Sequence, residues 1–203
     1  RFVGYAGGQY NSSKLKLGVS IYNENDLKNQ SLLQNLSNDQ ISILSQAGDD
    51  KSSMISPSAT PQEFSENRIL YKKELLNGQE VFVFSNNPND ELFQVNFLSV
   101  GDQQGDYIIS NLNSVTNIYE YVPPVMGQKQ GNYSPIIQLV APEKLQIAII
   151  NGSYQPSVKT NLEFEFAASR KDLNLFSNIS DSDNDGLAFR YKFNRAALSL
   201  NDN

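Results

Sequence analysis

The chain has 203 residues, enough to bury a sizeable core in one large β domain or two small ones. It carries 16 Lys and Arg against 22 Asp and Glu, a formal net charge of -6 that disfavours nucleic acid or an anionic membrane surface as a partner. Cysteine and histidine are both absent, which excludes disulfides, zinc–thiolate sites and Ser-His-Asp or Cys-His catalysis.

The sequence begins with Arg1-Phe2-Val3-Gly4 and not with Met, which suggests a processed chain or a fragment of a longer protein. No stretch of about 18 apolar residues occurs, so a transmembrane helix is not expected. Hydrophobic residues make up only 39% of the chain, while Tyr and Phe are plentiful. This composition favours long polar loops on a β scaffold.

The pattern Gly-x-x-x-Gly-x-Tyr occurs three times, at residues 4–10, 101–107 and 127–133. The unequal intervals argue against a solenoid of fixed period. We interpret each copy as a turn: the first Gly ends a strand at positive φ, the second reverses the chain, and the Tyr ring lies on the core. A phosphate-binding loop is the alternative, but it would lead into a helix, whereas Tyr107-Ile108-Ile109 is strand-like.

A strand is expected at residues 15–22, and from residue 23 to 50 the leucines and isoleucines come at helix-like intervals. Ser37-Asn38-Asp39-Gln40 matches a capping box ahead of an apolar run. The sequence therefore predicts a helix over Asn38–Ala47 that ends at Gly48, with a shorter turn near residues 27–36.

Several strands are predicted between the helix and the C-terminal region. Asn77-Gly78 is a strong signal for a two-residue hairpin turn between the first two of them. Pro123-Pro124 and Pro142 are expected to end the last two. The predicted strands cover residues 69–74, 81–85, 92–100, 117–122 and 136–140.

The clearest pattern is a C-terminal hairpin, preceded by a strand at residues 145–154. Residues 162–169 and 187–194 each alternate apolar and polar side chains, the period of a half-buried strand. In an antiparallel register whose paired numbers sum to 355, the apolar pairs share one face: Leu162–Phe193, Phe164–Tyr191, Phe166–Phe189 and Ala168–Leu187. The other face then pairs opposite charges: Glu163–Lys192 and Glu165–Arg190.

The predicted fold class is mainly β, with antiparallel hairpins in a meander and one short helical insertion. We expect an N-terminal mixed β module over residues 1–122, with the helical insertion at about 25–48, and a C-terminal β-hairpin module over residues 123–203. Strands of about ten alternating residues are also typical of a transmembrane β-barrel. Because the upstream half is irregular and bears a helix, such strands would belong to a larger β-barrel or β-sandwich protein.

Asp181, Asp183 and Asp185 alternate ahead of Gly186, like the first ligands and sharp turn of a calcium loop. A complete EF-hand is excluded because its twelfth position is Lys192. A looser calcium site, completed by Asp172 or backbone carbonyls, is one hypothesis. A plain solvated acidic loop is the other, and the sequence favours it.

The sequence offers two further candidate sites, a carboxylate pair and a group of tyrosines. Glu163 and Glu165 are spaced like a glycosidase pair, but Lys192 and Arg190 opposite them indicate ion pairs. A row of exposed tyrosines would offer a stacking platform for sugars, although tyrosines more often anchor cores and turns. The candidate platform residues are Tyr5, Tyr10, Tyr119, Tyr121 and Tyr133.

The second half of the chain contains several distinctive stretches: Tyr119–Pro124, Gln130–Pro135, Leu139–Pro142 and Ala168–Ser177, followed by an acidic loop and Gly186-Leu187-Ala188. Together these stretches resemble parts of large exported cell-envelope proteins of Bacteroidota. The resemblance implies the periplasm, outer membrane or cell surface, and a chain longer than the one given. It carries over no catalytic residues.

The sequence thus predicts a non-enzymatic structural or interaction module of a large bacterial envelope protein. Its expected partners are other envelope proteins or the rest of its own longer chain, through protein–protein contacts. No cofactor, apart from the candidate calcium, is expected, and the sequence leaves open whether the C-terminal strands meet lipid or water. The alternative is a secreted, adhesin-type module at the cell surface that binds glycan or calcium.

Overall fold

The computed structural model describes residues 1–28, 34–110 and 116–196. The described chain is mainly β, with antiparallel sheets and one α-helix, which confirms the predicted fold class. None of its helices is both long and apolar enough to cross a membrane. The chain divides into two compact units: Arg1–Met54 together with Val140–Asn203, and Ile55–Leu139.

This division differs from the predicted modules 1–122 and 123–203. The first strand of the chain pairs with the second, and the second pairs with a strand that begins at Lys144, so the two ends of the chain share one sheet. The residues between them form the second unit as an insertion. The prediction followed chain order, and local patterns carry no signal for such a long-range pairing.

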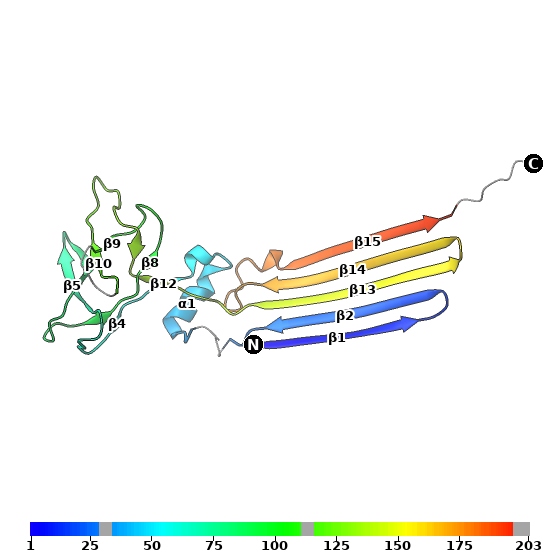
Figure 1. Ribbon diagram of the computed structural model, residues 1–203, viewed down its shortest axis with the longest axis horizontal. Helices are drawn as coiled ribbons and strands as arrows, with labels where there is room; N and C mark the ends of the chain where they lie inside the picture. The colour runs from blue at the N-terminus through cyan, green and yellow to red at the C-terminus, as the bar shows by residue number, and fades with distance from the viewer. Residues whose placement is uncertain (29–33, 111–115, 197–203) are drawn as a thin grey trace, which may run out of the picture. The chain divides into compact units, whose positions relative to one another are not determined.

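The first unit is built on one five-stranded antiparallel sheet, which we call the long sheet (Figure 1). The strands lie side by side in the order β1-β2-β13-β14-β15. The register of β14 and β15 is the predicted one, with Leu162 opposite Phe193 and Glu163 opposite Lys192. The five strands are β1 (Phe2–Asn11), β2 (Leu15–Asn25), β13 (Lys144–Ser157), β14 (Thr160–Asp172) and β15 (Asp185–Arg195).

The predicted helix is present as α1 (Asn38–Ala47). The Ser37 hydroxyl accepts a hydrogen bond from the Gln40 backbone N–H (3.3 Å), and the Gln40 side chain accepts one from the Ser37 N–H (3.0 Å). The helix ends at Gly48, whose φ is 60°. Capping box and stop are therefore confirmed, while the turn expected near residues 27–36 lies partly outside the described residues.

The loop between β14 and β15 holds the C-terminal end of α1. The Asn174 side chain, only 1% exposed, donates hydrogen bonds to the carbonyl oxygens of Leu44 (2.7 Å) and Gly48 (2.6 Å). Ser177 donates a third hydrogen bond to the Ser45 carbonyl at 3.0 Å. Two short 3-10 helices, η1 (Lys51–Ser53) and η2 (Asp181–Asp183), complete this unit.

The second unit consists of short strands in three small sheets. The β5–β6 hairpin has its predicted turn, because Asn77 and Gly78 both adopt positive φ (53° and 81°). The predicted strand 92–100 is interrupted at Asn96. The Ser58 hydroxyl accepts a hydrogen bond from the Asn96 N–H and donates one to the Asn96 carbonyl, so neither backbone group pairs with a neighbouring strand. The strands are β3 (Ile55–Pro57), β4 (Thr60–Pro61), β5 (Tyr71–Leu76), β6 (Gln79–Phe84), β7 (Phe93–Gln94), β8 (Leu98–Ser99), β9 (Tyr107–Ile109), β10 (Tyr119–Tyr121), β11 (Tyr133–Ser134) and β12 (Ile136–Gln138).

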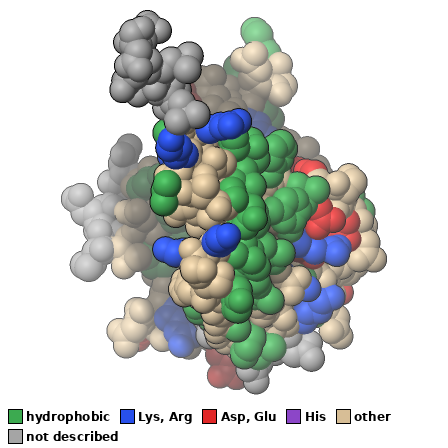
Figure 2. All heavy atoms as spheres, turned by 90° about the vertical axis from the view of Figure 1, so that its right-hand side faces the viewer, with side chains coloured by type: hydrophobic (Ala, Val, Ile, Leu, Met, Phe, Trp, Pro, Cys, Tyr) green, Lys and Arg blue, Asp and Glu red, His purple; other side chains and the backbone are tan. Residues whose placement is uncertain are grey.

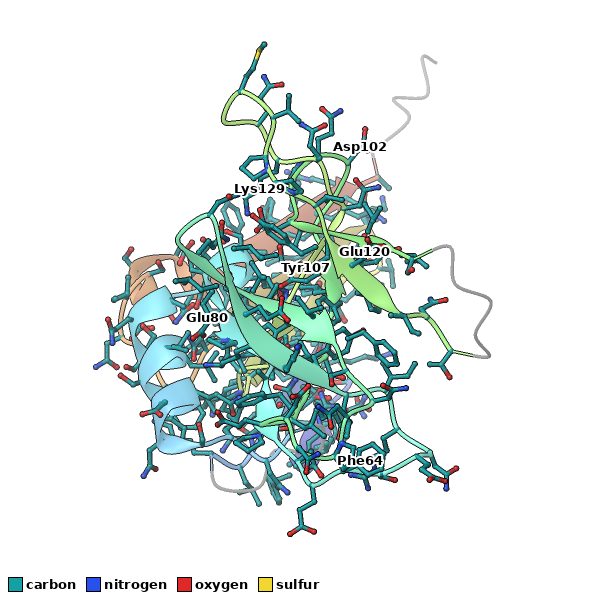
Figure 3. The ribbon with its side chains drawn as sticks, turned by 90° about the vertical axis from the view of Figure 1, so that its left-hand side faces the viewer. Phe64, Glu80, Asp102, Tyr107, Glu120 and Lys129 are labelled. Carbon is teal, nitrogen blue, oxygen red and sulfur yellow. The ribbon has the colours of Figure 1, made fainter. Side chains whose placement is uncertain are left out.

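Aromatic side chains form the core of this second unit, with Tyr107 among them (Figure 3). Tyr107 is 3% exposed, and its hydroxyl accepts a hydrogen bond from the Phe82 backbone N–H at 2.7 Å. Burial raises the pKa of the Tyr107 phenol to about 12. The Tyr71 hydroxyl makes the same kind of bond to the Tyr119 N–H, at 3.0 Å. Both rings are thus buried with their polar ends satisfied.

The three copies of the Gly-x-x-x-Gly-x-Tyr motif adopt different structures. The turn interpretation is wrong for the first copy, because Gly4 and Gly8 lie inside β1. In the other two copies the first glycine has positive φ (Gly101 109°, Gly127 79°), as predicted, and the tyrosine begins a strand. These two copies also pair with each other, which was not predicted: Gly105 and Gly131 exchange two backbone hydrogen bonds, at 2.9 and 3.0 Å.

Candidate functional site

The register of the long sheet assigns every side chain to one of two faces. We call the face that carries Phe164 the apolar face and the face that carries Glu163 the polar face. On the apolar face, residues paired across all five strands form successive rows. Four consecutive rows contain no charged side chain: Ala6–Ile21–Ala148–Ala168–Leu187, Gly8–Val19–Ile150–Phe166–Phe189, Tyr10–Leu17–Gly152–Phe164–Tyr191, and Leu15–Tyr154–Leu162–Phe193.

Much of this apolar face is open to solvent. Phe189 is 84% exposed and Leu187 is 77% exposed, and Phe166 in the neighbouring strand is 45% exposed. Figure 2, a view from the end of the sheet that carries the β1–β2 and β13–β14 turns, shows hydrophobic side chains gathered in a continuous band. Such a contiguous apolar surface marks an interaction site, because single exposed apolar residues are common and extended patches are not.

The apolar rows stop abruptly at one end. The next row on the same face contains Asn23, Gln146, Arg170 and Asp185 on four adjacent strands. Gln146 donates a hydrogen bond to the Asn23 side chain at 2.9 Å, and Arg170 lies 3.9 Å from Asp185. The boundary between apolar and polar surface therefore runs straight across the sheet.

The polar face carries the predicted ion pairs. Arg190 lies 3.6 Å from Glu165, and Lys192 lies 3.9 Å from Glu163. Both carboxylates thus have the cationic neighbour that the sequence assigned to them, as expected for a solvated surface. Near the β1–β2 turn the first two strands continue this face with Gln9, Asn11 and Lys16, whereas toward the other end the face carries Tyr5, Ile147 and Ile149.

The two edge strands of the long sheet have one neighbour each among the described residues. β1 runs for ten residues without a proline or a charged side chain. Soluble proteins protect such an edge with Pro, Lys, a bulge or a covering segment, because its free N–H and C=O groups are a template for another strand. β1 has neither a Pro nor a Lys along its length.

The residues of the candidate calcium loop do not converge. Asp181 and Asp183 lie in η2, where the Asp181 side chain accepts a hydrogen bond from Asn184 at 3.1 Å, whereas Asp185 begins β15 beside Arg170. Within residues 1–28, 34–110 and 116–196, no group of three or more acidic, His or Cys side chains is placed to hold a metal ion. Calcium binding by this loop stays a prediction.

Asp49 lies where several carboxylates affect one another. Burial raises its pKa, and the negative charges of Asp172, Asp183, Asp181 and Glu143 raise it further. A raised carboxyl pKa means that the ionised form destabilises the fold, a penalty present at neutral pH and gone below the ordinary value of 3.8. We therefore expect Asp49→Asn to raise the melting temperature at neutral pH by on the order of 1 °C, with the gain disappearing as the pH falls to 3.8.

Asp50→Asn is the matched control for this prediction. Hydrogen bonds from Ser53 and Ser52 lower the pKa of Asp50, so its ionised form stabilises the fold above the carboxyl's ordinary pKa. This substitution should lower the melting temperature at neutral pH, and its effect should fade as the pH falls through the lowered pKa. Melts of both variants across a pH series, followed by circular dichroism, check the opposite signs. A shift of the same sign for both would contradict the assignment.

The tyrosines proposed as a sugar platform do not form one. Tyr119, Tyr121 and Tyr133 contact other rings in the core of the second unit. Tyr5 and Tyr10 are exposed, but their positions in β1 place them on opposite faces of the long sheet. The apolar face therefore remains the strongest candidate site.

Comparison with known proteins adds no identity. No protein-family model, curated protein or solved structure matches the chain. Sequence reasoning found the apolar face on β14 and β15 and missed its continuation over β13, β2 and β1. The signal was present in the alternating Leu15, Leu17, Val19 and Ile21, but only the pairing of β2 with β13 shows that these residues extend the same surface.

Proposed function

We propose that the chain is a non-enzymatic structural module of a large bacterial envelope protein, in which further strands continue the long sheet at β1 and β15. The observation that carries this proposal is a ten-residue edge strand that is free of charge and proline, in a sheet whose apolar face is exposed. The added strands come from the rest of its own longer chain or from another envelope protein. The second unit, with its own aromatic core, is then a folded insertion carried by that sheet.

Two further observations support this proposal. The edge strand β15 presents Leu187, Phe189, Tyr191 and Phe193 in one exposed row, so an added strand would bury apolar as well as backbone surface. The resemblance of the second half of the chain to exported proteins of Bacteroidota supports a setting in the periplasm, outer membrane or cell surface.

Hydrogen exchange of the backbone amides tests the proposal. The protein should be isolated from its own cells in its natural assembly, and its exchange compared with that of the 203-residue chain alone in water. We expect the β1 and β15 amides to exchange roughly tenfold or more slowly in the natural assembly, because paired edges open less often.

The central strand β13 and the hairpin strand β6 of the second unit serve as internal controls, since the proposal predicts a smaller change there. Equal exchange of β1 and β15 in the two samples would show that the edges have no added neighbours and would overturn the proposal.

A further inference from the structure

We propose that the apolar face of the long sheet contacts the hydrocarbon of a lipid bilayer. The inference rests on the proposed function, because a sheet in hydrocarbon must have its edge N–H and C=O groups paired by further strands. It goes beyond it by naming what covers the apolar face. The argument uses the height of the apolar rows, their boundaries and their lack of hydrogen-bonding groups.

The height of the apolar surface fits a bilayer. On β14, the four rows run from Ala168 to Leu162, six residues along the strand, or about 20 Å at about 3.4 Å per residue. Successive rows on one face are two residues, or about 6.8 Å, apart. Adding half of this spacing at each end gives the apolar surface a length of about 27 Å along the strands. In sheets that cross membranes the strands tilt by about 35–45°, so about 27 Å along the strands spans roughly 19–22 Å along the membrane normal, close to the outward apolar band of about 25 Å that such sheets carry.

Both boundaries of the apolar surface have the chemistry of a membrane–water interface. At one end, the row of Asn23, Gln146, Arg170 and Asp185 puts amide and charged groups on four adjacent strands. At the other end, Tyr10, Tyr154 and Tyr191 lie in the last two apolar rows, each with a partly exposed ring. Tyrosine is enriched where an apolar ring body meets hydrocarbon and its hydroxyl meets water.

The apolar surface is also poor in the groups that a protein partner would use. Five strands about 4.8 Å apart and about 27 Å of height give roughly 650 Å². A protein interface of that size carries about three to six hydrogen bonds. Within the four rows, the only hydrogen-bonding side chains are the tyrosines at one margin. Hydrocarbon needs no such groups.

The polar face agrees with this arrangement. Its two ion pairs, Glu165–Arg190 and Glu163–Lys192, lie on the side of the sheet turned away from the proposed lipid. Strands whose outward side chains are apolar and whose inward side chains are polar have the alternation expected of a membrane-crossing sheet. The net charge of -6 disfavours an anionic lipid surface but has no bearing on contact with the apolar interior.

Site-directed spin labelling tests the proposal, and the 203 residues contain no cysteine of their own that would compete for the label. The intact protein, isolated in its natural assembly, is reconstituted into phosphatidylcholine vesicles. Labels are placed at Phe166→Cys and Phe189→Cys on the apolar face, and at Ala167→Cys and Ala188→Cys on the polar face as matched neighbours. Collision rates with oxygen, which dissolves in lipid, and with a water-soluble nickel chelate are then measured.

We expect the ratio of oxygen to nickel collisions to be several-fold higher at residues 166 and 189 than at residues 167 and 188. A label at Leu162→Cys, two rows closer to the boundary, should give an intermediate ratio, because oxygen concentrates toward the centre of the bilayer. This depth gradient would not arise from burial against a protein.

Low collision rates with both reagents at residues 166 and 189 would mean that a protein or a second copy of the chain covers the face, and would overturn the lipid assignment. High nickel collision rates there would overturn it as well. Amide exchange distinguishes the two proposals: protected β1 and β15 with a water- or protein-covered face leave the proposed function standing, whereas unprotected edges remove both.

Discussion

Gly131→Ala is expected to unfold the second unit of this protein at moderate temperature. A Cβ atom at residue 131 would lie 2.4 Å from the Tyr107 nitrogen and 2.5 Å from the Tyr107 carbonyl oxygen. Both are backbone atoms, so the strands themselves would have to separate, and the two hydrogen bonds between Gly105 and Gly131 would break. Overpacking and lost hydrogen bonds together should lower the free energy of unfolding by about 3–5 kcal/mol.

For a domain of this size, that loss corresponds to a fall in melting temperature of roughly 15–25 °C. Thermal unfolding followed by tyrosine near-ultraviolet circular dichroism measures it, because the tyrosine-rich core of this unit reports on its packing. Gly127→Ala in the same motif is the matched control. No atom lies within 4 Å of a Cβ there, so only the left-handed backbone (φ 79°) opposes it, at about 1–2 kcal/mol. Similar losses for both variants would contradict the close-approach explanation.

The pairing of Gly105 with Gly131 could not be predicted from local sequence patterns. The positive φ of Gly101 and Gly127 followed from the motif, because a glycine that ends a strand has a local reason to be there. The contact between Gly105 and Gly131 joins residues that are far apart in the chain, and no spacing within either motif indicates it. The same motif inside β1 carries no turn at all. The repeated pattern therefore indicated where glycine is required, but not whether the reason is a positive φ or a close approach of two backbones.

Local signals did predict the elements that are stabilised locally. The capping box of α1 and the Asn77-Gly78 turn act within a few residues, and both are present. The β14–β15 register was also predictable, because the aromatic rows and the charge pairs agree on one alignment. Only part of the candidate site could be predicted: β14 and β15 alternate clearly, but the extent of the apolar face depends on which strands become their neighbours.

The buried Asn174 was not predicted, and its replacement should have the second large effect. Its side-chain amide donates to the carbonyl oxygens of Leu44 and Gly48, which the end of α1 leaves without helical partners. Asn174→Asp keeps the shape of the side chain and replaces the donor by a carboxylate oxygen that faces two carbonyl oxygens. At neutral pH this should cost about 3–4 kcal/mol, because one oxygen of a buried charge then faces two carbonyl oxygens, while the other keeps only the Phe176 N–H as a donor (3.2 Å).

The pH dependence distinguishes this mechanism from a general loss of packing. Burial beside two carbonyl oxygens should raise the pKa of the introduced carboxyl, so stability should return as the pH falls through that raised value and the protonated acid donates one hydrogen bond. Asn174→Ala loses the hydrogen bonds to Leu44 and Gly48 and the one from the Phe176 N–H, and it cannot titrate, so it should stay destabilised throughout. Asn178→Asp, at an exposed position in the same loop, should change little at any pH.

Melts of the three variants from neutral to acidic pH give the measurement. If Asn174→Asp and Asn174→Ala were equally unstable at every pH, the side chain would act by filling space and not as a donor to the helix end. Recovery of Asn174→Asp alone would show that the Asn174 amide acts as a donor to the end of α1, beside the hydrogen bond from Ser177 to Ser45. The C-terminal end of α1 would then be held by the loop between β14 and β15, through a residue that lies 126 positions further along the chain than Gly48.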